Sequence, residues 1–229
     1  MNPNLIYENK DLKVLITGAA RGIGKACFDL YTLKGAKVKG PTRSELDLSD
    51  KNFGEESLEE LGNFDVLILN AAINEICNFE DINDDNLLNL LQVNTISNLK
   101  IIKQNLEYMK KQKWGRIVFL SSLFESRSKV GRTMYSMSKA ANGAMIRNLA
   151  IEFGKYNILT NSVAPGYVST DLTKRNNSLE DLQEIETTIP LNRLAEPKEI
   201  AEICFVLGSQ SNTYINGHSL VADGGLSCR

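Results

Sequence analysis

The sequence predicts a single-domain α/β protein, with a doubly wound parallel sheet of about seven strands and helices on both faces. Two observations support this fold. Short apolar runs rich in β-branched residues recur along the chain, as expected for strands buried on both sides. Segments with helical periodicity separate most of these runs, and such alternation is typical of parallel sheets. The 229 residues are expected to form one domain, 1–229, without an internal repeat.

The N-terminal half of the chain contains four of the predicted strands. Two of them are apolar runs, at 14–16 and 66–69, whereas the segments at 36–39 and 46–48 are short and include charged residues. A helical pattern follows the first strand and ends before Gly35, a residue that accepts the left-handed conformation common after helices. An acidic helical stretch follows the third strand. We therefore expect strands at 14–16, 36–39, 46–48 and 66–69, and helices at 23–34 and 50–61.

The C-terminal half contains the longer helices. Regularly spaced leucines and isoleucines predict one helix over 84–111, and Pro197 marks the start of the last helix. Pro165 and Gly166 must form a turn. Residues 167–196 are polar and irregular, and we expect them to form a lid over the substrate. The expected helices are 84–111, 134–153 and 197–207, and the expected strands are 117–120, 158–163 and 218–221.

Composition argues against several classes of function. The net charge of −2 comes from basic and acidic residues mixed along the chain, so nothing favours nucleic acid or an anionic membrane as a partner. No apolar run approaches the ~20 residues of a membrane span. The first residues also lack a signal-peptide pattern. Scattered cysteines and a single histidine, His218, predict no metal site. We expect a cytoplasmic protein with reduced thiols.

A glycine-rich turn lies between the first strand and the first helix. Its spacing is Gly-x-x-x-Gly-x-Gly, with Gly18, Gly22 and Gly24. Such a turn lets the backbone approach a diphosphate closely, and the following helix presents free N–H groups to the anion. Three glycines alone can serve a purely structural turn, but their position after a buried strand favours a dinucleotide site. The predicted phosphate contacts are Gly18, Ala20, Arg21, Gly22, Ile23 and Gly24.

The end of the second strand indicates which dinucleotide binds. An acidic residue there favours NAD, whereas basic residues pair with the 2′-phosphate of NADP. The segment after Lys39 contains Thr42 and Arg43, and no carboxylate precedes Glu45. Arg21 in the turn can reach the same region, and a guanidinium binds phosphate through paired hydrogen bonds. We therefore predict NADP(H), with NAD(H) possible if both arginines are ordinary solvated residues.

Tyr135 and Lys139 form the candidate catalytic pair. They lie four apart in a predicted helix, so their side chains share one face, and the ammonium is expected to lower the pKa of the phenol. Such a pair supplies an acid/base for a carbonyl or an alcohol. The pattern is common by chance, but three features support it. Ser122 ends a strand, Asn94 interrupts an apolar helix as a polar network or a helix bend would, and Asn70-Ala71-Ala72 leaves room for a cofactor.

In this order and spacing, the motifs resemble those of the short-chain dehydrogenase/reductase family, in its short, non-extended branch. The match runs from about Lys13 to Gly225 and implies a Rossmann-like fold. The segment from Ile189 to Ala201 resembles the 3-oxoacyl-acyl carrier protein reductase group. The residues that carry the resemblance are Thr17, Gly18, Gly22, Ile23, Gly24, Asp47, Asn70, Ala71, Asn94, Ser122, Tyr135, Lys139, Pro165, Gly166, Asp223, Gly224 and Gly225.

The resemblance implies a role for each matching residue. Tyr135 would be the general acid/base, Lys139 would lower its pKa and bind the nicotinamide ribose, and Ser122 would polarise the substrate oxygen. Asn94 would hold a water molecule for proton relay. Further cofactor contacts would come from Asp47, Leu48, Asn70, Ala71, Ala72, Pro165, Gly166, Val168 and Thr170, with Asp47 and Leu48 at the adenine and Thr170 at the carboxamide.

Two departures from the family pattern concern the cofactor site. Ala72 stands where the family has glycine, which adds a methyl group beside the cofactor. Residues 40–46 alone separate Lys39 from Asp47, so the helix that normally follows the second strand is missing and the adenine side is expected to be more open.

The loops around the expected active site carry basic residues. Arg127, Lys129 and Arg132 lie between Ser122 and Tyr135, which favours a small polar or anionic substrate, whereas an ordinary solvated loop is the alternative. A 3-oxoacyl thioester reductase and a sugar or sugar-nucleotide ketoreductase of a surface-carbohydrate pathway both remain open. By position, the candidate substrate residues are Asn74, Leu123, Phe124 and Tyr167.

A function of another class is also open. The chain could be a catalytically silent regulator that senses a dinucleotide, although the intact catalytic positions disfavour this hypothesis. The family further implies a homo-oligomer, a tetramer or a dimer, built through the helices predicted at 84–111 and 134–153.

Overall fold

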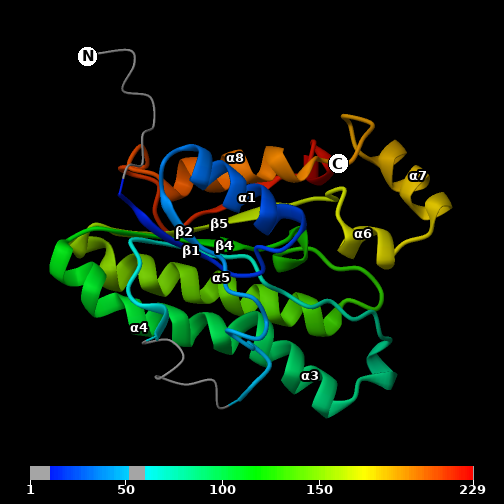
Figure 1. Cartoon of the computed structure of the whole chain (residues 1–229). Coiled ribbons are helices and arrows are strands. Elements are labelled where there is room, and N and C mark those ends of the chain that lie inside the picture. The colour runs from blue at the N-terminus through cyan, green and yellow to red at the C-terminus, as the bar shows by residue number, and fades with distance from the viewer. Residues whose placement is uncertain (1–10, 52–59, 229) are drawn as a thin grey trace.

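The computed structural model describes residues 11–51 and 60–228 and contains one parallel sheet of six described strands. The strand order is β2-β1-β3-β4-β5-β6, and every neighbouring pair is parallel (Figure 1). The chain leaves β1 on one side to form β2 and returns on the other to form β3, so the carboxyl ends of β1 and β3 border a crevice where such sheets bind ligands. The strands are β1 (Lys13–Ile16), β2 (Lys37–Lys39), β3 (Val66–Leu69), β4 (Gly115–Leu120), β5 (Ile158–Pro165) and β6 (Ser219–Ala222).

Helices cover both faces of the sheet, as the sequence predicts. Helices α1 (Gly22–Leu33) and α8 (Pro197–Gly208) pack on one face, and α4 (Ser97–Gln112) and α5 (Thr133–Phe153) pack on the other (Figure 1). The two apolar cores lie between these layers. Cys27, Tyr31 and Cys204 belong to the first core, and Ile101, Met109 and Ile146 belong to the second. The doubly wound fold is therefore confirmed. Among the described helices, none is both long and apolar enough to cross a membrane.

The strand predicted at 46–48 is wrong. This segment is irregular, although Leu46 and Leu48 are buried against the second core. A parallel strand needs a crossover of about a dozen residues or more, and residues 40–45 are too few to return the chain to the same edge. Of the helix predicted at 50–61, residues 52–59 lie outside the described part of the chain.

The helix predicted at 84–111 is divided in three. It consists of α3 (Asp84–Leu91), a π-helical turn at Gln92–Ile96, and α4. A π-turn adds one residue to the helix and frees backbone groups from the regular pattern. Here the carbonyl of Asn94 accepts hydrogen bonds from the side chains of Asn98 and Asn142, at 2.7 and 2.8 Å. The interruption that the sequence suggested at Asn94 is thus a π-turn within a buried polar network.

Residues 167–196 contain two helices, so the expectation that this segment is irregular is wrong, while its role as a lid stays a prediction. These are α6 (Asp171–Arg175) and α7 (Leu179–Thr188). Ser178 and Asp181 cap α7 reciprocally, because each side chain accepts a hydrogen bond from the other residue's backbone N–H. Ile185 is buried and anchors the helix. Both helices lie at one end of the sheet (Figure 1), beside the carboxyl ends of its strands.

Candidate active site

The glycine turn has the geometry of a diphosphate cradle. Gly18 and Gly22 have φ values of +67° and +56°, a region that favours glycine. A Cβ atom at Gly24 would lie 2.2 Å from the carbonyl oxygen of Gly18, so the turn closes on itself only without a side chain there. Helix α1 follows at once, with no acidic residue in its first turn and no side-chain cap. Its first N–H groups are therefore available to an anion, and the turn fits a dinucleotide diphosphate.

Asn70 and Thr17 hold the turn against the end of β3. The Asn70 side chain donates hydrogen bonds to the carbonyl oxygens of Thr17 and Gly18, at 3.0 and 3.1 Å. The Thr17 hydroxyl accepts from the backbone N–H groups of Asn70 and Ala71, both at 3.0 Å. The amide of Asn70 is thus occupied in bracing the turn.

Two adjoining cavities extend from this turn in opposite directions. One, of about 250 Å³, reaches Tyr135 and Lys139, and the other, of about 240 Å³, reaches Asp47. Both are lined by Gly18, Ala71 and Ala72. Of the other residues predicted at the cofactor, the first cavity includes Arg21, Gly22, Ile23, Asn70, Pro165 and Thr170, and the second includes Arg43 and Leu48. Gly166 and Val168 line a neighbouring pocket, whereas Ala20, Gly24 and Thr42 line neither cavity.

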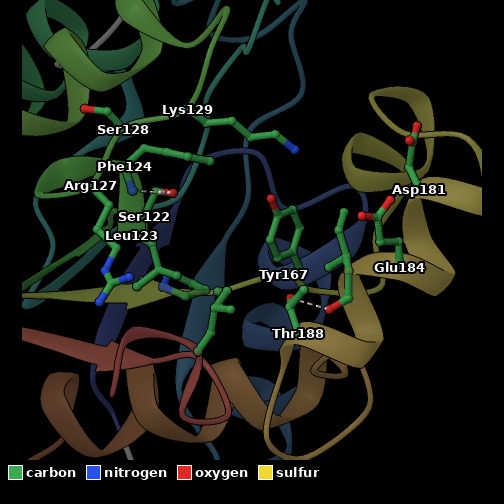
Figure 2. A pocket seen from close by; sticks show the side chains of 14 residues that line it. Ser122, Leu123, Phe124, Arg127, Ser128, Lys129, Tyr167, Asp181, Glu184 and Thr188 are labelled. Atoms are coloured by element: carbon green, nitrogen blue, oxygen red, sulfur yellow. Dashed lines mark hydrogen bonds between the residues drawn. The ribbon is translucent and has the colours of Figure 1, made fainter. Parts of the chain in front are cut away.

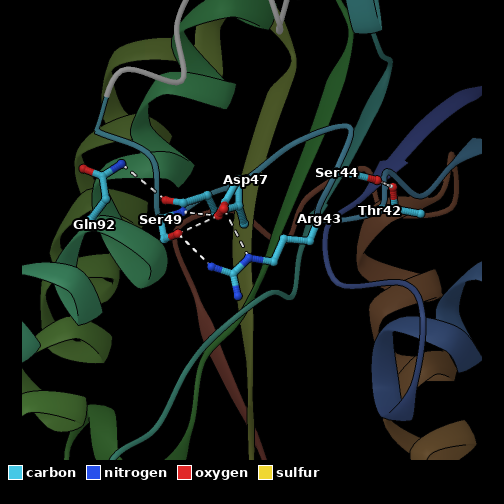
Figure 3. Close-up of polar contacts among 7 residues, drawn as sticks. Thr42, Arg43, Ser44, Asp47, Ser49 and Gln92 are labelled. Carbon is cyan, nitrogen blue, oxygen red and sulfur yellow. Dashed lines mark hydrogen bonds and ion pairs between the residues drawn. The ribbon is translucent and has the colours of Figure 1, made fainter.

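The open end of the second cavity carries Arg43 in an exposed ion pair. Arg43 Nε donates to Asp47 Oδ2 at 3.2 Å and its Nη2 donates to Ser49 Oγ at 3.1 Å (Figure 3). Hydrogen bonds from Ser49 and the ion pair with Arg43 lower the pKa of Asp47. The Arg43 side chain is 80% exposed, so the pair holds it weakly. Thr42 is occupied elsewhere, since its hydroxyl and its N–H both donate to Glu45.

Tyr135, Lys139 and Ser122 meet at the carboxyl end of β4. Tyr135 and Lys139 lie one turn apart in α5 and are 8% and 3% exposed. The Lys139 ammonium lies 5.3 Å from the centroid of the Tyr135 ring and donates to the carbonyl of Leu120 at 2.6 Å. The Ser122 hydroxyl accepts from the N–H of Phe124 at 3.2 Å.

The pKa of Tyr135 moves in the direction opposite to the sequence prediction. Burial raises it to about 12, and the Ser122 hydroxyl and the Arg132 guanidinium offset this rise in part. Burial also lowers the pKa of Lys139 to about 8, which Glu125 opposes. The expectation that the ammonium lowers the pKa of the phenol is therefore not met in this structure, because desolvation dominates.

Asn94 holds the backbone of Ile73, a residue that lines the second cavity. Its Oδ1 accepts from the N–H of Ile73, and its Nδ2 donates to the Ile73 carbonyl, both at 2.9 Å. Nδ2 also donates to the Ser138 hydroxyl at 3.1 Å. Asn94 thus ties α5 to the loop that follows β3, while its role in a proton relay stays a prediction.

Glu125 is a polar residue of the site that the sequence did not predict. Its Oε2 accepts hydrogen bonds from the hydroxyls of Ser121 at 2.5 Å and Ser219 at 3.0 Å. A Cβ atom at Gly143 would lie 2.4 Å from its Oε1, so that glycine makes room for the carboxylate. The available signal was that Glu125 is the one acidic residue between Ser122 and Tyr135.

A larger cavity of about 460 Å³ opens on the other side of Ser122 (Figure 2). The loop after β4 forms one wall and α7 the other, with Tyr167 between them. Three of the predicted substrate residues, Leu123, Phe124 and Tyr167, line this cavity, and Asn74 lines a small pocket next to it. Basic Arg127 and Lys129 and acidic Asp181 and Glu184 are also in the lining. No group of three or more potential metal ligands occurs in residues 11–51 and 60–228.

Known proteins share both the sequence pattern and the fold. Residues 44–227 match the family model described as enoyl-(acyl carrier protein) reductase. The 3-oxoacyl-acyl-carrier-protein reductase FabG of Vibrio cholerae is 32% identical, over 93% of this chain and 96% of its own. A structure described as an NAD(P)-dependent gluconate 5-dehydrogenase from Beutenbergia cavernae, with bound NADP, superposes with a TM-score of 0.91 at 27% identity, over 97% and 99% of the two chains. A gluconate 5-dehydrogenase from Burkholderia cenocepacia, in complex with NADP and tartrate, shares the fold at a TM-score of 0.92 and 21% identity, over 97% and 98%.

Proposed function

The chain belongs to the short-chain dehydrogenase/reductase family of oxidoreductases, and on this premise we propose that it moves hydride between NADP(H) and a carbonyl or alcohol of a small polar or anionic substrate. The observation that carries the proposal is that Tyr135 and Lys139 line the cavity that begins at the glycine turn, while Ser122 lines the adjoining pocket that also contains Tyr135. A reacting group and a dinucleotide would meet there. The bound nicotinamide supplies or accepts the hydride.

The charges at the open end of the second cavity, which reaches Asp47, favour NADP(H) over NAD(H). No carboxylate ends β2, and the exposed guanidinium of Arg43 can turn from Asp47 towards a 2′-phosphate. The relative from Beutenbergia cavernae also binds NADP. Titration of the purified protein with NADPH and NADH, followed by nicotinamide fluorescence, should give tighter binding of NADPH. Binding of neither would contradict the proposal.

Tyr135 is the proposed proton donor in the reductive direction. A phenol with a pKa of about 12 holds its proton at neutral pH, so it can donate that proton to the carbonyl oxygen as the alcohol forms. Ser122 would hold the same oxygen from the other side. Lys139 is mostly protonated at neutral pH and uses one N–H on Leu120, which leaves its other donors for ribose hydroxyls.

The second candidate is the reduction of a 3-oxoacyl thioester. It is favoured by the 32% identity to FabG and by the apolar residues of the large cavity, among them Leu123, Phe124 and Ile185. The acidic and basic side chains in the same lining favour a polar substrate instead. Rates with acetoacetyl-coenzyme A and with oxo derivatives of sugars and sugar acids would separate the two.

We further propose a cytoplasmic homo-oligomer, a tetramer or a dimer, that assembles through α4 and α5. Ala140, Ala141 and Ala144 are exposed on α5, where small side chains permit close helix contact. Leu99 on α4 and Met137 on α5 are 50% and 47% exposed. A monomeric mass in light scattering would contradict this assembly.

Tyr135→Phe tests the proposed chemistry. It removes the hydroxyl and keeps the ring, so NADPH should bind within about twofold of wild type while turnover falls by about a hundredfold or more. Tyr214→Phe is the matched control, since Tyr214 is 94% exposed and lies outside the cavities described above. Retained turnover in Tyr135→Phe would contradict the acid/base assignment, whereas loss of NADPH binding would indicate a structural role.

A further inference from the structure

Arg132 is a buried arginine that pairs with no carboxylate of the described residues. The residue is 4% exposed, and it occurs in none of the ion pairs found among the described residues. Its Nη1 atom is buried and has no hydrogen-bond partner. The guanidinium lies 5.6 Å from the centroid of the Phe124 ring. Burying a charge costs free energy unless the charge is paired, so a bound anion would stabilise the Arg132 guanidinium.

The guanidinium belongs to the reacting end of the substrate site. Arg132 precedes α5, three positions before Tyr135, and lines a pocket of about 130 Å³ together with Tyr135 and Ser122. This pocket also shares Phe124 and Tyr167 with the large cavity, so the two are compartments of one site. Burial lowers the pKa of Arg132, as expected for an uncompensated cation.

The same pocket contains an unpaired acceptor. Asn74 lines it, and its Oδ1 atom is buried without a hydrogen-bond partner. One compartment beside Tyr135 therefore offers a charged donor and a neutral acceptor, and the described residues form a hydrogen bond with neither Arg132 Nη1 nor Asn74 Oδ1. A ligand that satisfies both must carry an anionic group and a hydrogen-bond donor.

We propose that Arg132 and Asn74 recognise a carboxylate and a hydroxyl of the substrate, so that the enzyme acts on hydroxylated carboxylic acids and their oxo forms. This inference rests on the proposed function. A carboxylate matches the planar fork of a single guanidinium. A phosphate dianion would need further cations. Arg127, however, is bonded to the carbonyl of Ser227, and Lys129 lies near Asp181.

Matched pairs of substrates test the carboxylate. D-gluconate and D-glucitol share a polyol chain and differ in one terminal group, as do D-glycerate and glycerol. With NADP⁺, the wild-type enzyme should prefer the acid in at least one pair by about tenfold or more in kcat/KM. Arg132→Gln should lower kcat/KM for that acid by about 10- to 100-fold, mainly through KM, because a hydrogen-bonded charge pair is lost.

Of three further variants, two separate recognition from folding and from general charge, and the third tests Asn74. Arg132→Lys keeps the charge but not the paired N–H donors of the guanidinium, so the loss in kcat/KM for the acid should be intermediate and NADPH binding unchanged. This variant keeps the test valid if Arg132→Gln is unstable. Arg147→Gln removes the same charge from an exposed position of α5, about 22 Å further along the helix, and should leave the preference unchanged. Asn74→Ala should narrow the preference for D-glycerate over D-lactate, which lacks the second hydroxyl.

The outcomes distinguish this inference from the proposed function. Equal kcat/KM for acids and neutral alcohols, or equal losses in Arg132→Gln and Arg147→Gln, would overturn the substrate class alone. Turnover of acetoacetyl-coenzyme A without turnover of either acid would also overturn it. A wild-type protein that turns over none of these substrates with NADP(H) would overturn both.

Discussion

Lys139 is a buried cation, and its removal should stabilise the protein while it abolishes turnover. Burial lowers the pKa of Lys139 from the ordinary value of 10.5 to about 8. At about 1.4 kcal/mol per pH unit, the charged form costs roughly 3 kcal/mol of folding free energy at neutral pH. Lys139→Met removes this cost and keeps a side chain of similar length. It also leaves the Leu120 carbonyl without its partner at 2.6 Å, a loss of about 1–2 kcal/mol. We expect a net gain of about 1–2 kcal/mol.

The stability difference between Lys139→Met and wild type should depend on pH, because the destabilisation by Lys139 requires its charge. Between about pH 8 and 10.5 the unfolded chain holds the Lys139 proton and the folded chain does not, so wild-type stability rises with pH in this window. The advantage of Lys139→Met should therefore shrink by about 2 kcal/mol from pH 7 to about pH 9.5. Tyr135, with its pKa raised to about 12, acts in the opposite direction above about pH 10, so the comparison stays below that pH.

Urea denaturation of the two proteins at both pH values measures the effect. Lys198→Met, at an exposed position of α8, is the control and should change the free energy of unfolding by a few tenths of a kcal/mol. A Lys139→Met variant that is less stable than wild type at pH 7, by an amount independent of pH, would refute the reasoning. The rate at which the same sample reduces a carbonyl substrate with NADPH should fall to background, because the proposed contact of Lys139 with the nicotinamide ribose is lost.

Two further variants test the cofactor site. Arg43→Ala should raise the Kd for NADPH by about tenfold or more and change that for NADH by less than about twofold, since a phosphate contact of the guanidinium is lost. Equal changes would show that Arg43 does not contact the 2′-phosphate. Gly24→Ala places a Cβ 2.2 Å from the Gly18 carbonyl, so it should lower the free energy of unfolding by about 1–3 kcal/mol and prevent NADPH binding. Gly154→Ala, where the contact is the side-chain amide of Asn216 at 3.1 Å, is the control, and NADPH binding unchanged in both would contradict the proposed cradle.

Local sequence patterns were sufficient where they agreed with the chain's connectivity. The glycine turn, the apolar strands and the four-residue spacing of Tyr135 and Lys139 depend on neighbours in sequence, and the structure has them as expected. The strand at 46–48 failed because apolar alternation indicates burial, while pairing needs a crossover that this loop is too short to make. The length of this loop can be read from the sequence, and it excludes the pairing that the apolar alternation alone indicates.

Other features depended on tertiary surroundings. The π-turn at 92–96 is stabilised by Asn98 and by Asn142, the latter 48 positions from Asn94, and no local pattern reports such a contact. The rise in the pKa of Tyr135 depends on how completely the fold covers it. Helix α7 was different, since Ser178 and Asp181 form a capping pattern that the sequence displays before an amphipathic segment.

The short connection after β2 also has a consequence for the behaviour of the protein in concentrated solution. In the sheet of described strands, β2 is an edge strand with one open side, and such edges can recruit strands from other molecules and start aggregation. β2 is three residues long and carries lysine at both ends, and Lys37 is paired with Asp11 at 2.9 Å. Brevity and charge are common means by which sheet proteins discourage such recruitment. The described sheet therefore lacks the strand predicted at 46–48, and its β2 edge is too short and too charged to favour pairing with strands of other molecules.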